Sequence, residues 1–119
     1  MVNQTNVVGY LEAALKAAGV RGKAIASNLA NLNTPGFRRS SVEFEKYLAE
    51  AMKSKRPIDV AEIQAKILQP MTTPVDGQGN DVSLEMEIGD MIRNGALYKT
   101  YVRLLSKLYD QMEFAINGQ

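Results

Sequence analysis

The stretch DGQGNDVSLEME carries the residue types of a calcium-binding loop. Asp76, Gln78 and Asn80 fall at loop positions 1, 3 and 5, and Glu87 falls at position 12, where such loops place a bidentate carboxylate. Position 6 must turn sharply and takes glycine, but here it is Asp81. Because that position fails, and because no helical pattern directly precedes the loop, we interpret the stretch as a glycine-rich connection ending in a helix cap.

Other candidate chemistry is also incomplete. The GVRGKA stretch lacks the spacing and the hydroxyl residue of a phosphate-binding loop, and it lies inside a helical pattern. The pairs Glu43 with Glu45 and Glu85 with Glu87 are two residues apart, so on a helix their carboxylates point to different sides. The short basic clusters RR and KSKR have acidic neighbours, and we interpret them as solvated surface.

The composition excludes several classes of function. The chain has 119 residues, no histidine and no cysteine, which removes the usual general base, the thiolate nucleophile and most zinc ligands. A net charge of +1, from 14 basic and 13 acidic residues, provides no field for nucleic acid. We therefore expect no enzyme, no cofactor, no metal, no small-molecule substrate and no nucleic-acid partner. The sequence also lacks a bilayer-spanning stretch and a cleavable signal pattern, so we expect any export to proceed without signal cleavage.

A heptad pattern predicts a long helix over residues 7–33, after a flexible N-terminus at 1–6. Apolar and small residues alternate at spacings of four and three without a slip, as in a coiled-coil seam. The predicted seam positions of this helix are Val8, Leu11, Leu15, Ala18, Gly22, Ile25, Leu29 and Leu32.

A second heptad pattern predicts a long helix over residues 83–117. Ser83 is a suitable N-cap, and Glu85 and Glu87 lie in the first turn, where the helix dipole favours carboxylates. The predicted seam positions are Leu84, Ile88, Met91, Gly95, Tyr98, Val102, Leu105, Tyr109, Met112 and Ile116.

Gly22 and Gly95 each occupy a seam position where leucine is expected. A glycine inside a helix costs about 1 kcal/mol relative to alanine, so each position needs a reason. Close crossing by a partner helix and a weak or bent point in the helix are both consistent with the sequence.

Residues 34–82 form a turn, an arm and a variable connecting segment. Thr34, Pro35, Gly36 and Phe37 fit a type II turn, with proline fixing the first central φ and glycine supplying the positive φ. The SSVEFEKYLAEAMKSK stretch fits a short amphipathic helix or an extended arm. Between two prolines, PIDVAEIQAKILQP predicts a short helix with one apolar side, formed by Val60, Ile63, Ile67 and Leu68.

The predicted fold class is therefore all-α, with the N- and C-terminal long helices paired as one antiparallel coiled-coil core and an irregular or partly helical middle segment. Each long helix also carries a second stripe away from its seam. Leaving a large apolar side chain of such a stripe exposed forfeits about 1.5 to 3 kcal/mol, so we expect neighbouring copies to cover it. Alternatively, residues 42–68 fold back and complete a monomeric bundle. The predicted subunit-interface residues are Tyr10, Ala13, Ala17, Val20, Ala24, Asn28, Asn31, Asn33, Leu97, Tyr101, Leu104 and Leu108.

Three of these residues are asparagines at the end of the first helix. Asn28, Asn31 and Asn33 lie off the seam, where their amides can cap the last carbonyl groups or bond to a neighbouring subunit. The sequence leaves both interpretations open.

The stretch ASNLANLNTPGFRR closely resembles the N-terminal signature of the flagellar axial proteins, which are the rod, hook and hook-associated subunits. Subunits of the proximal rod, the smallest rod proteins, are the most similar. They share the step seen here as SVEFEKYL, the helix start seen as DGQGNDVSLE and a tyrosine-containing ending like NGALYKTYVRLLSKLYDQMEFAI. The resemblance covers residues 8–56 and 76–117. The signature residues are Asn28, Leu29, Ala30, Asn31, Asn33, Thr34, Pro35, Gly36 and Phe37.

This resemblance implies a structural subunit that stacks helically into a hollow, torque-transmitting rod of the flagellar basal body, in the periplasm. It implies export through the flagellar type III apparatus, and as partners copies of the chain, other rod subunits, the basal adaptor and the export gate. Three alternatives stay open: another flagellar axial subunit, a secretion-system inner-rod-like assembly protein, and a monomeric helical binding module.

Overall fold

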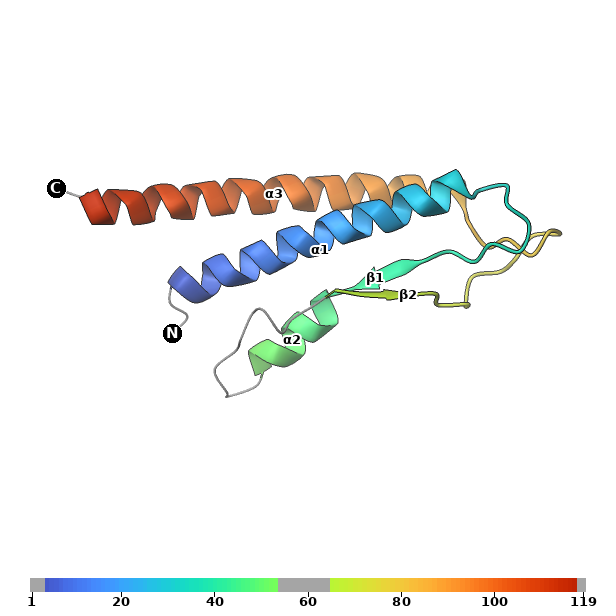
Figure 1. Ribbon diagram of the computed structural model, residues 1–119, viewed down its shortest axis with the longest axis horizontal. Helices are drawn as coiled ribbons and strands as arrows, with labels where there is room; N and C mark the ends of the chain where they lie inside the picture. Colours follow the sequence, from blue (N-terminus) through green and yellow to red (C-terminus); the bar gives the residue numbers. More distant parts are fainter. Residues whose placement is uncertain (1–3, 54–64, 118–119) are drawn as a thin grey trace.

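The computed structural model describes residues 4–53 and 65–117. Two long helices run antiparallel along most of the molecule, and a short strand–helix–strand segment connects them (Figure 1). This arrangement confirms the predicted fold class, with two short strands in the middle segment. The elements are α1 (Gln4–Ala30), β1 (Ser41–Glu43), α2 (Glu45–Lys53), β2 (Lys66–Leu68) and α3 (Leu84–Asn117).

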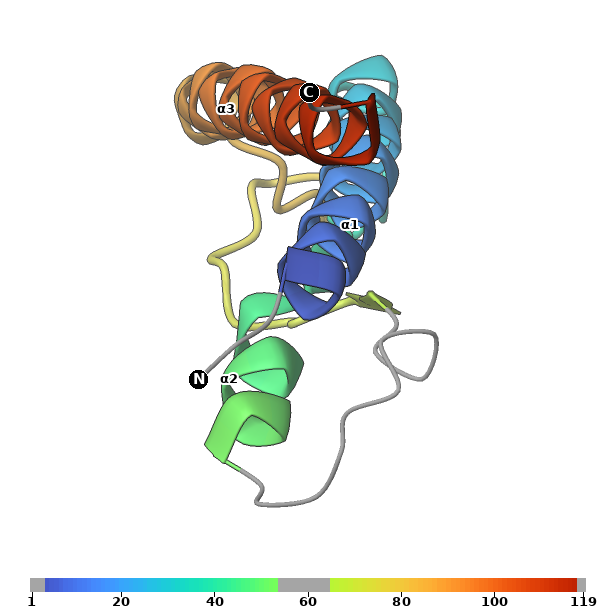
Figure 2. The same cartoon turned by 90° about the vertical axis from the view of Figure 1, so that its left-hand side faces the viewer.

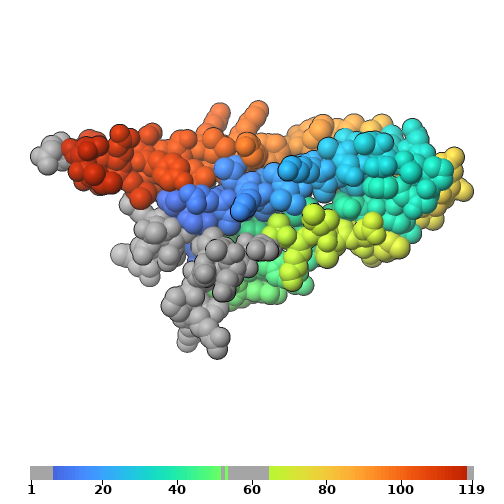
Figure 3. Space-filling view, in the orientation of Figure 1, coloured from blue at the N-terminus to red at the C-terminus, as the bar shows by residue number. Residues whose placement is uncertain are grey.

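The molecule is elongated and layered, with extents of 65 × 29 × 16 Å. Viewed along the long axis, α1 lies between α3 on one side and the strands with α2 on the other (Figure 2). The space-filling view shows the same order, with the two long helices along one edge (Figure 3). Helix α1 is therefore the element that both other layers can cover. No helix within the two described ranges is long and apolar enough to cross a membrane.

Helix α1 starts earlier and ends earlier than the span 7–33 that the sequence suggests. Its last helical residue is Ala30, and residues 31–33 form turns. The Leu32 N–H bonds to the Leu29 carbonyl at 3.2 Å, a three-residue spacing that tightens the chain at the helix end. Pro35 disfavours helical geometry at the residue before it, so the helix must stop in this region.

Helix α3 begins as the sequence predicts. The Ser83 hydroxyl accepts a hydrogen bond from the Met86 N–H at 3.4 Å, and the Ser83 carbonyl accepts the Glu87 N–H at 2.9 Å. Ser83 therefore occupies the N-cap position and satisfies a backbone donor of the first turn.

The middle segment combines both structures considered for it, an extended arm and a short helix. Strands β1 and β2 pair antiparallel, with Val42 opposite Ile67. The helix predicted between Pro57 and Pro70 is wrong where the structure describes it, because Ile67 and Leu68 lie in β2. Pairing with β1 satisfies their backbone groups and overrides the apolar spacing. Val60 and Ile63 fall outside the described residues.

A small core joins the middle segment to α1. The Phe44 side chain is 2% exposed and packs against Ala14 and Ala17 of α1. Leu48 of α2 and Tyr101 of α3 complete the cluster. Because alanine is short, the arm lies close to the α1 backbone, and one phenylalanine fills the space between them.

Candidate assembly interface

The signature turn after α1 has the geometry of a type II turn. The Phe37 N–H bonds to the Thr34 carbonyl at 3.2 Å, and Gly36 has a φ of 75°. Pro35 occupies the first central position, where its fixed φ suits this turn. The turn therefore redirects the chain from α1 into the arm.

The glycine-rich loop before α3 closes over this turn. The Asn80 amide donates to the Asn31 carbonyl at 2.8 Å and to the Thr34 carbonyl at 2.9 Å. The Gly36 N–H bonds to the Gln78 carbonyl at 2.8 Å. Gly79, with a φ of 78°, approaches Gly36 so closely that an added Cβ would lie 3.6 Å from the Gly36 Cα. The loop that resembled a calcium site is thus a cap for the end of α1.

A buried carboxylate ties the same loop to the arm. Asp81 is 2% exposed; one of its oxygens accepts the Arg39 N–H at 2.5 Å, and the other accepts Arg38 Nε at 3.1 Å. Both arginines directly follow the signature turn. They were interpreted from the sequence as solvated, but Arg39 is buried, and its guanidinium pairs with Glu87 and Asp90 of α3.

Glu87 joins three layers of the structure. Its Oε1 accepts Arg39 Nε at 2.7 Å and its Oε2 accepts the Asn28 amide at 3.1 Å, and the side chain is fully buried. The Asn28 amide also bonds to the Ser40 carbonyl at 2.8 Å, while its oxygen accepts the Ser40 N–H at 2.9 Å. Every oxygen of this buried carboxylate is therefore paired, as burial of a charge requires. We name the buried set Asn28, Arg39, Asn80, Asp81 and Glu87 the polar clasp.

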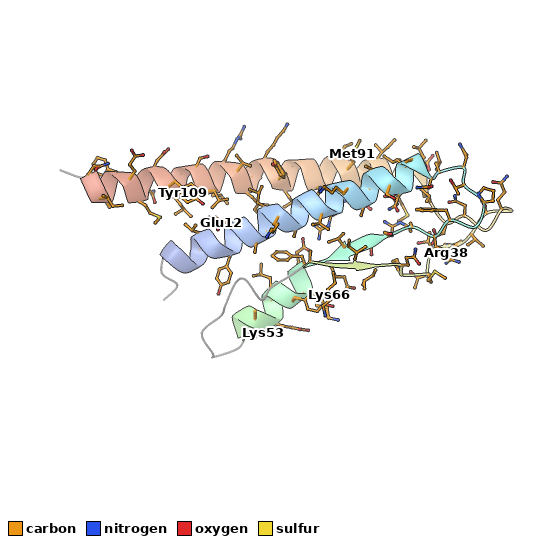
Figure 4. The ribbon with its side chains drawn as sticks, in the orientation of Figure 1. Glu12, Arg38, Lys53, Lys66, Met91 and Tyr109 are labelled. Atoms are coloured by element: carbon orange, nitrogen blue, oxygen red, sulfur yellow. The ribbon has the colours of Figure 1, made fainter. Side chains whose placement is uncertain are left out.

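Sequence reasoning missed the polar clasp as a unit. The local signals were that Asn80 and Asp81 lie three and two residues before the N-cap Ser83, and that Arg39 follows the turn. What brings them together is the pairing of segments more than 40 residues apart. The clasp holds the two long helices and the arm at one end of the molecule (Figure 4, near Arg38).

The three signature asparagines have different surroundings. Asn28 lies inside the clasp and bonds within its own chain. The Asn31 amide donates to the Ser27 carbonyl at 2.8 Å, a local C-cap, and its oxygen accepts the Thr34 hydroxyl at 3.1 Å. Asn33 is exposed. Of the three predicted interface positions, Asn33 is thus the most accessible to a neighbour.

The predicted seam residues of α1 are buried or partly buried. Ala18 and Ile25 are buried, and Gly22 lies beneath Asn94 of α3. The remaining predicted α1 seam residues are partly buried: Val8, Leu11, Leu15, Leu29 and Leu32.

The α3 side differs from the predicted seam in both of its rows: Leu84, Met91 and Tyr98 of one row are exposed, and the other row is shifted by one residue. Leu105 is buried and Met112 is partly buried. The other inward row is Glu87, Asn94, Tyr101 and Leu108, each seven residues apart, in place of Ile88, Gly95, Val102, Tyr109 and Ile116. Apolar spacing did not identify this row, because Glu87 and Asn94 are polar and the neighbouring row contains more apolar residues.

The displaced seam is an exposed apolar row on α3. Its members repeat with heptad spacing along the helix and are between 38% and 80% exposed. Gly95 lies in the same row, and an added Cβ there would meet nothing within 4 Å. We name Leu84, Ile88, Met91, Tyr98, Val102, Tyr109 and Ile116 the outward row. Figure 4 labels Met91 and Tyr109 of this row.

One member of the outward row also contacts α1. The Tyr109 hydroxyl donates a hydrogen bond to the Glu12 carboxylate, and the two side chains lie on facing sides of the helix pair (Figure 4). This hydrogen bond raises the pKa of Tyr109, because the phenolate would face a carboxylate. Tyr109 therefore lies at the border between the outward row and the side of α3 that contacts α1.

The second stripe of α1 is covered by the chain itself. Ala17 and Ala24 are 2% and 8% exposed, and Ala13 packs against the Phe44 cluster. These positions were expected to contact another subunit, but the arm lies over them, which corresponds to the fold-back alternative for this face. Tyr10 and Val20, from the same stripe, are partly buried. On α3, Tyr101 and Leu108 are also partly buried, while Leu97 and Leu104 remain exposed.

An ion pair fixes the arm across α1. Arg21 donates to the Glu45 carboxylate at 2.7 Å and to the Val42 carbonyl at 3.2 Å. Burial raises the pKa of Glu45, but the hydrogen bonds from Arg21 and from backbone N–H groups outweigh it, so the pKa is lowered.

Comparisons with known proteins find similarity to flagellar basal body rod proteins. A sequence model of the family described as flagella basal body rod protein matches residues 11–38, which include most of α1 and the signature turn. The flagellar basal body rod protein FlgB of Bacillus subtilis (strain 168) is 26% identical over 123 residues, covering 96% of this chain and 95% of that protein. FlgB of Aeromonas hydrophila is 28% identical and covers 93% and 92%. FlgB of Borrelia hermsii is 22% identical and covers 86% and 89%.

The signature turn lies directly after α1, within the stretch that the family model matches. These comparisons support a structural subunit of the flagellar basal body rod. The relatives of this chain align along nearly their whole length, and within the rod proteins they support the FlgB type.

Proposed function

We propose that this rod subunit assembles helically with copies of itself and with other rod subunits into the hollow, torque-transmitting proximal rod. The outward row of α3 carries this proposal. Seven large apolar side chains with coiled-coil spacing, and a glycine among them with open space above it, form a seam that its own α1 leaves exposed.

The energetic argument concerns α3 rather than α1. Fully burying one large apolar side chain contributes about 1.5 to 3 kcal/mol; most members of the outward row are already partly buried, so each contributes less, and the row favours association as a set. The arm already covers α1 through Phe44. In each subunit the arm therefore covers α1, while the outward row of α3 stays exposed and available to a neighbour.

The basal adaptor and the flagellar type III export gate are proposed as further partners. Support comes from the resemblance to proximal-rod subunits, which lie next to both. The rival function of a monomeric helical module is favoured by one observation, the cover of α1 by the arm, but the outward row of α3 is unexplained in such a module.

A matched pair of variants tests the proposal. Val102 lies in the outward row and Thr100 lies on an exposed part of the same helix, and both are β-branched. We expect Val102→Glu to abolish concentration-dependent association in sedimentation velocity, while Thr100→Glu associates like the natural chain. Equal association of both variants, with unchanged helix content by circular dichroism, would show that the outward row is not the assembly surface.

A further inference from the structure

A groove lies where α1, the arm and the first half of α3 meet. Its volume is about 390 Å³, and its lining combines apolar side chains, including Val42 and Leu97, with arginines at its edge. This volume is in the range, about 300 to 1,000 Å³, of sites that enclose substantial side chains or ligands. The groove is distinct from the outward row, because no member of that row lines it.

The groove contains a buried polar atom without a partner. Asn94 lines it and is 8% exposed; the Asn94 amide donates to the Ala18 carbonyl at 2.9 Å. The Asn94 oxygen is buried and makes no hydrogen bond within the described part of the chain. An unsatisfied buried acceptor costs about 1 to 3 kcal/mol, so a donor supplied by an occupant would relieve that cost.

Charged side chains line the groove, and Arg93, which pairs with Asp90, is the most exposed of its arginines. Three arginines and two carboxylates line it, and the Arg93 side chain is 71% exposed. An occupant that combines an apolar anchor, a carboxylate and a hydrogen-bond donor would match all three properties of the groove.

The end of α3 carries that combination. Phe114 is 72% exposed and points away from the side of α3 that bears the outward row, so assembly through that row would not cover it. Asp110 lies four residues before it and Asn117 three residues after it, which places all three on one face. The last turn holds no basic residue, so the negative end of the helix dipole is not compensated there. In Figure 1 the last turns of α3 extend beyond the start of α1.

We propose that the last turns of α3 in one copy occupy this groove in the next copy. Phe114 packs on the apolar floor, Asp110 approaches Arg93, and the Asn117 amide donates to the Asn94 oxygen. This inference rests on the self-association proposed above and adds a second, head-to-tail contact to it.

The contact joins two different surfaces of the molecule. The α3 residues that line the groove lie near the start of the helix, about 30 Å from its last turns at 1.5 Å per residue. A contact of this kind leaves a groove empty at one end of a row of subunits and a helix end exposed at the other, so it repeats into a chain.

Disulfide trapping tests the contact directly, because the natural chain has no cysteine. Ser41 lines the groove, and Gln111 is exposed three residues before Phe114. The double variant Ser41→Cys with Gln111→Cys should give a ladder of covalent oligomers on mild oxidation. The control Ser41→Cys with Ser106→Cys places the second thiol on α3 away from the helix end, and we expect no ladder from it.

The outcomes separate the two proposals. If the natural chain sediments as an assembly but the double variant gives no more cross-linking than its control, or gives closed dimers alone, the head-to-tail contact is wrong and self-association stands. If the natural chain does not associate at any concentration, both proposals fail.

Charge reversal provides a second test. Arg93→Glu should weaken association about two- to fivefold, the range expected for an exposed ion pair. Adding Asp110→Lys to the same chain should restore it. Failure of the second change to restore association would mean that these two side chains do not meet.

Discussion

Replacing Glu87 by alanine should strongly destabilise the fold, because it removes the buried partner of Arg39 and Asn28. The change leaves Arg39, whose side chain is 10% exposed, without its closest carboxylate at 2.7 Å. Removing one partner of a buried ion pair costs about 3 to 5 kcal/mol. Arg39 keeps a more distant contact with Asp90 at 3.6 Å, and Asn28 keeps its bonds to Ser40, so the lower limit of about 3 kcal/mol is expected.

Thermal unfolding followed by circular dichroism measures this loss. For a chain of this size about 3 kcal/mol corresponds to a fall in Tm of about 10 to 15 °C. Glu85→Ala is the matched control, since Glu85 lies in the same turn and is exposed, and a fall of no more than a few degrees is expected. The combined change Glu87→Leu with Arg39→Met should cost less than the sum of the single changes, because it removes both charges.

The reasoning would be refuted by a Glu87→Ala variant that melts within 3 °C of the natural chain. The reasoning would also be refuted if the stability losses of the Glu87 and Arg39 changes were strictly additive. Additivity would mean that the two side chains do not stabilise the fold as a pair.

Three further outcomes are expected. Gly22→Ala should raise stability by up to about 1 kcal/mol in denaturant titration, because an added Cβ would lie 3.6 Å from the Asn94 amide, an ordinary contact, and alanine favours the helix; a loss would mean that close helix crossing needs glycine. Phe44→Ala should cost about 3 to 5 kcal/mol and expose the arm to limited proteolysis, because it empties the core on α1. The pKa of Glu45 is lowered by Arg21, so its contribution to stability is present above the unfolded pKa, near 4.5, and is lost as the pH falls through the folded value. Melting temperatures between pH 6 and about pH 3 should therefore fall less steeply for Glu45→Gln.

The turn after α1 and the start of α3 could be predicted because their signals are local. Pro35 and Gly36 determine the turn by their own backbone preferences, and Ser83 caps a helix wherever its side chain reaches the first turn. Such features depend on a few neighbouring residues, so no knowledge of distant contacts is required.

The rotation of α3 about its axis could not be predicted from apolar spacing alone. Ile88 and Val102 belong to a continuous heptad row, but the structure turns Glu87 and Asn94 toward α1 instead. These polar residues are buried because Arg39 and the Ala18 carbonyl satisfy them. When a helix has apolar residues on more than one side, the row with the most apolar residues need not face the chain's own core.

The packing of the arm on α1 also could not be predicted, because it depends on contacts between residues far apart in sequence. Phe44 and Ala17 are far apart in sequence, and neither indicates the other by its type. Only the packed structure shows that the arm covers the small-residue stripe of α1, which leaves α3 as the helix with an uncovered apolar surface.

Protection of the outward row on assembly is the most direct measurement. With no natural cysteine in the chain, a thiol introduced as Val102→Cys can be labelled at rising protein concentration, with Thr100→Cys as the control on an exposed part of the same helix. Assembly through the outward row predicts that labelling of position 102 slows strongly as the chain associates, because the thiol becomes buried in a packed interface, while position 100 changes little. Equal labelling rates of position 102 in the dilute and associated protein would contradict the proposed interface.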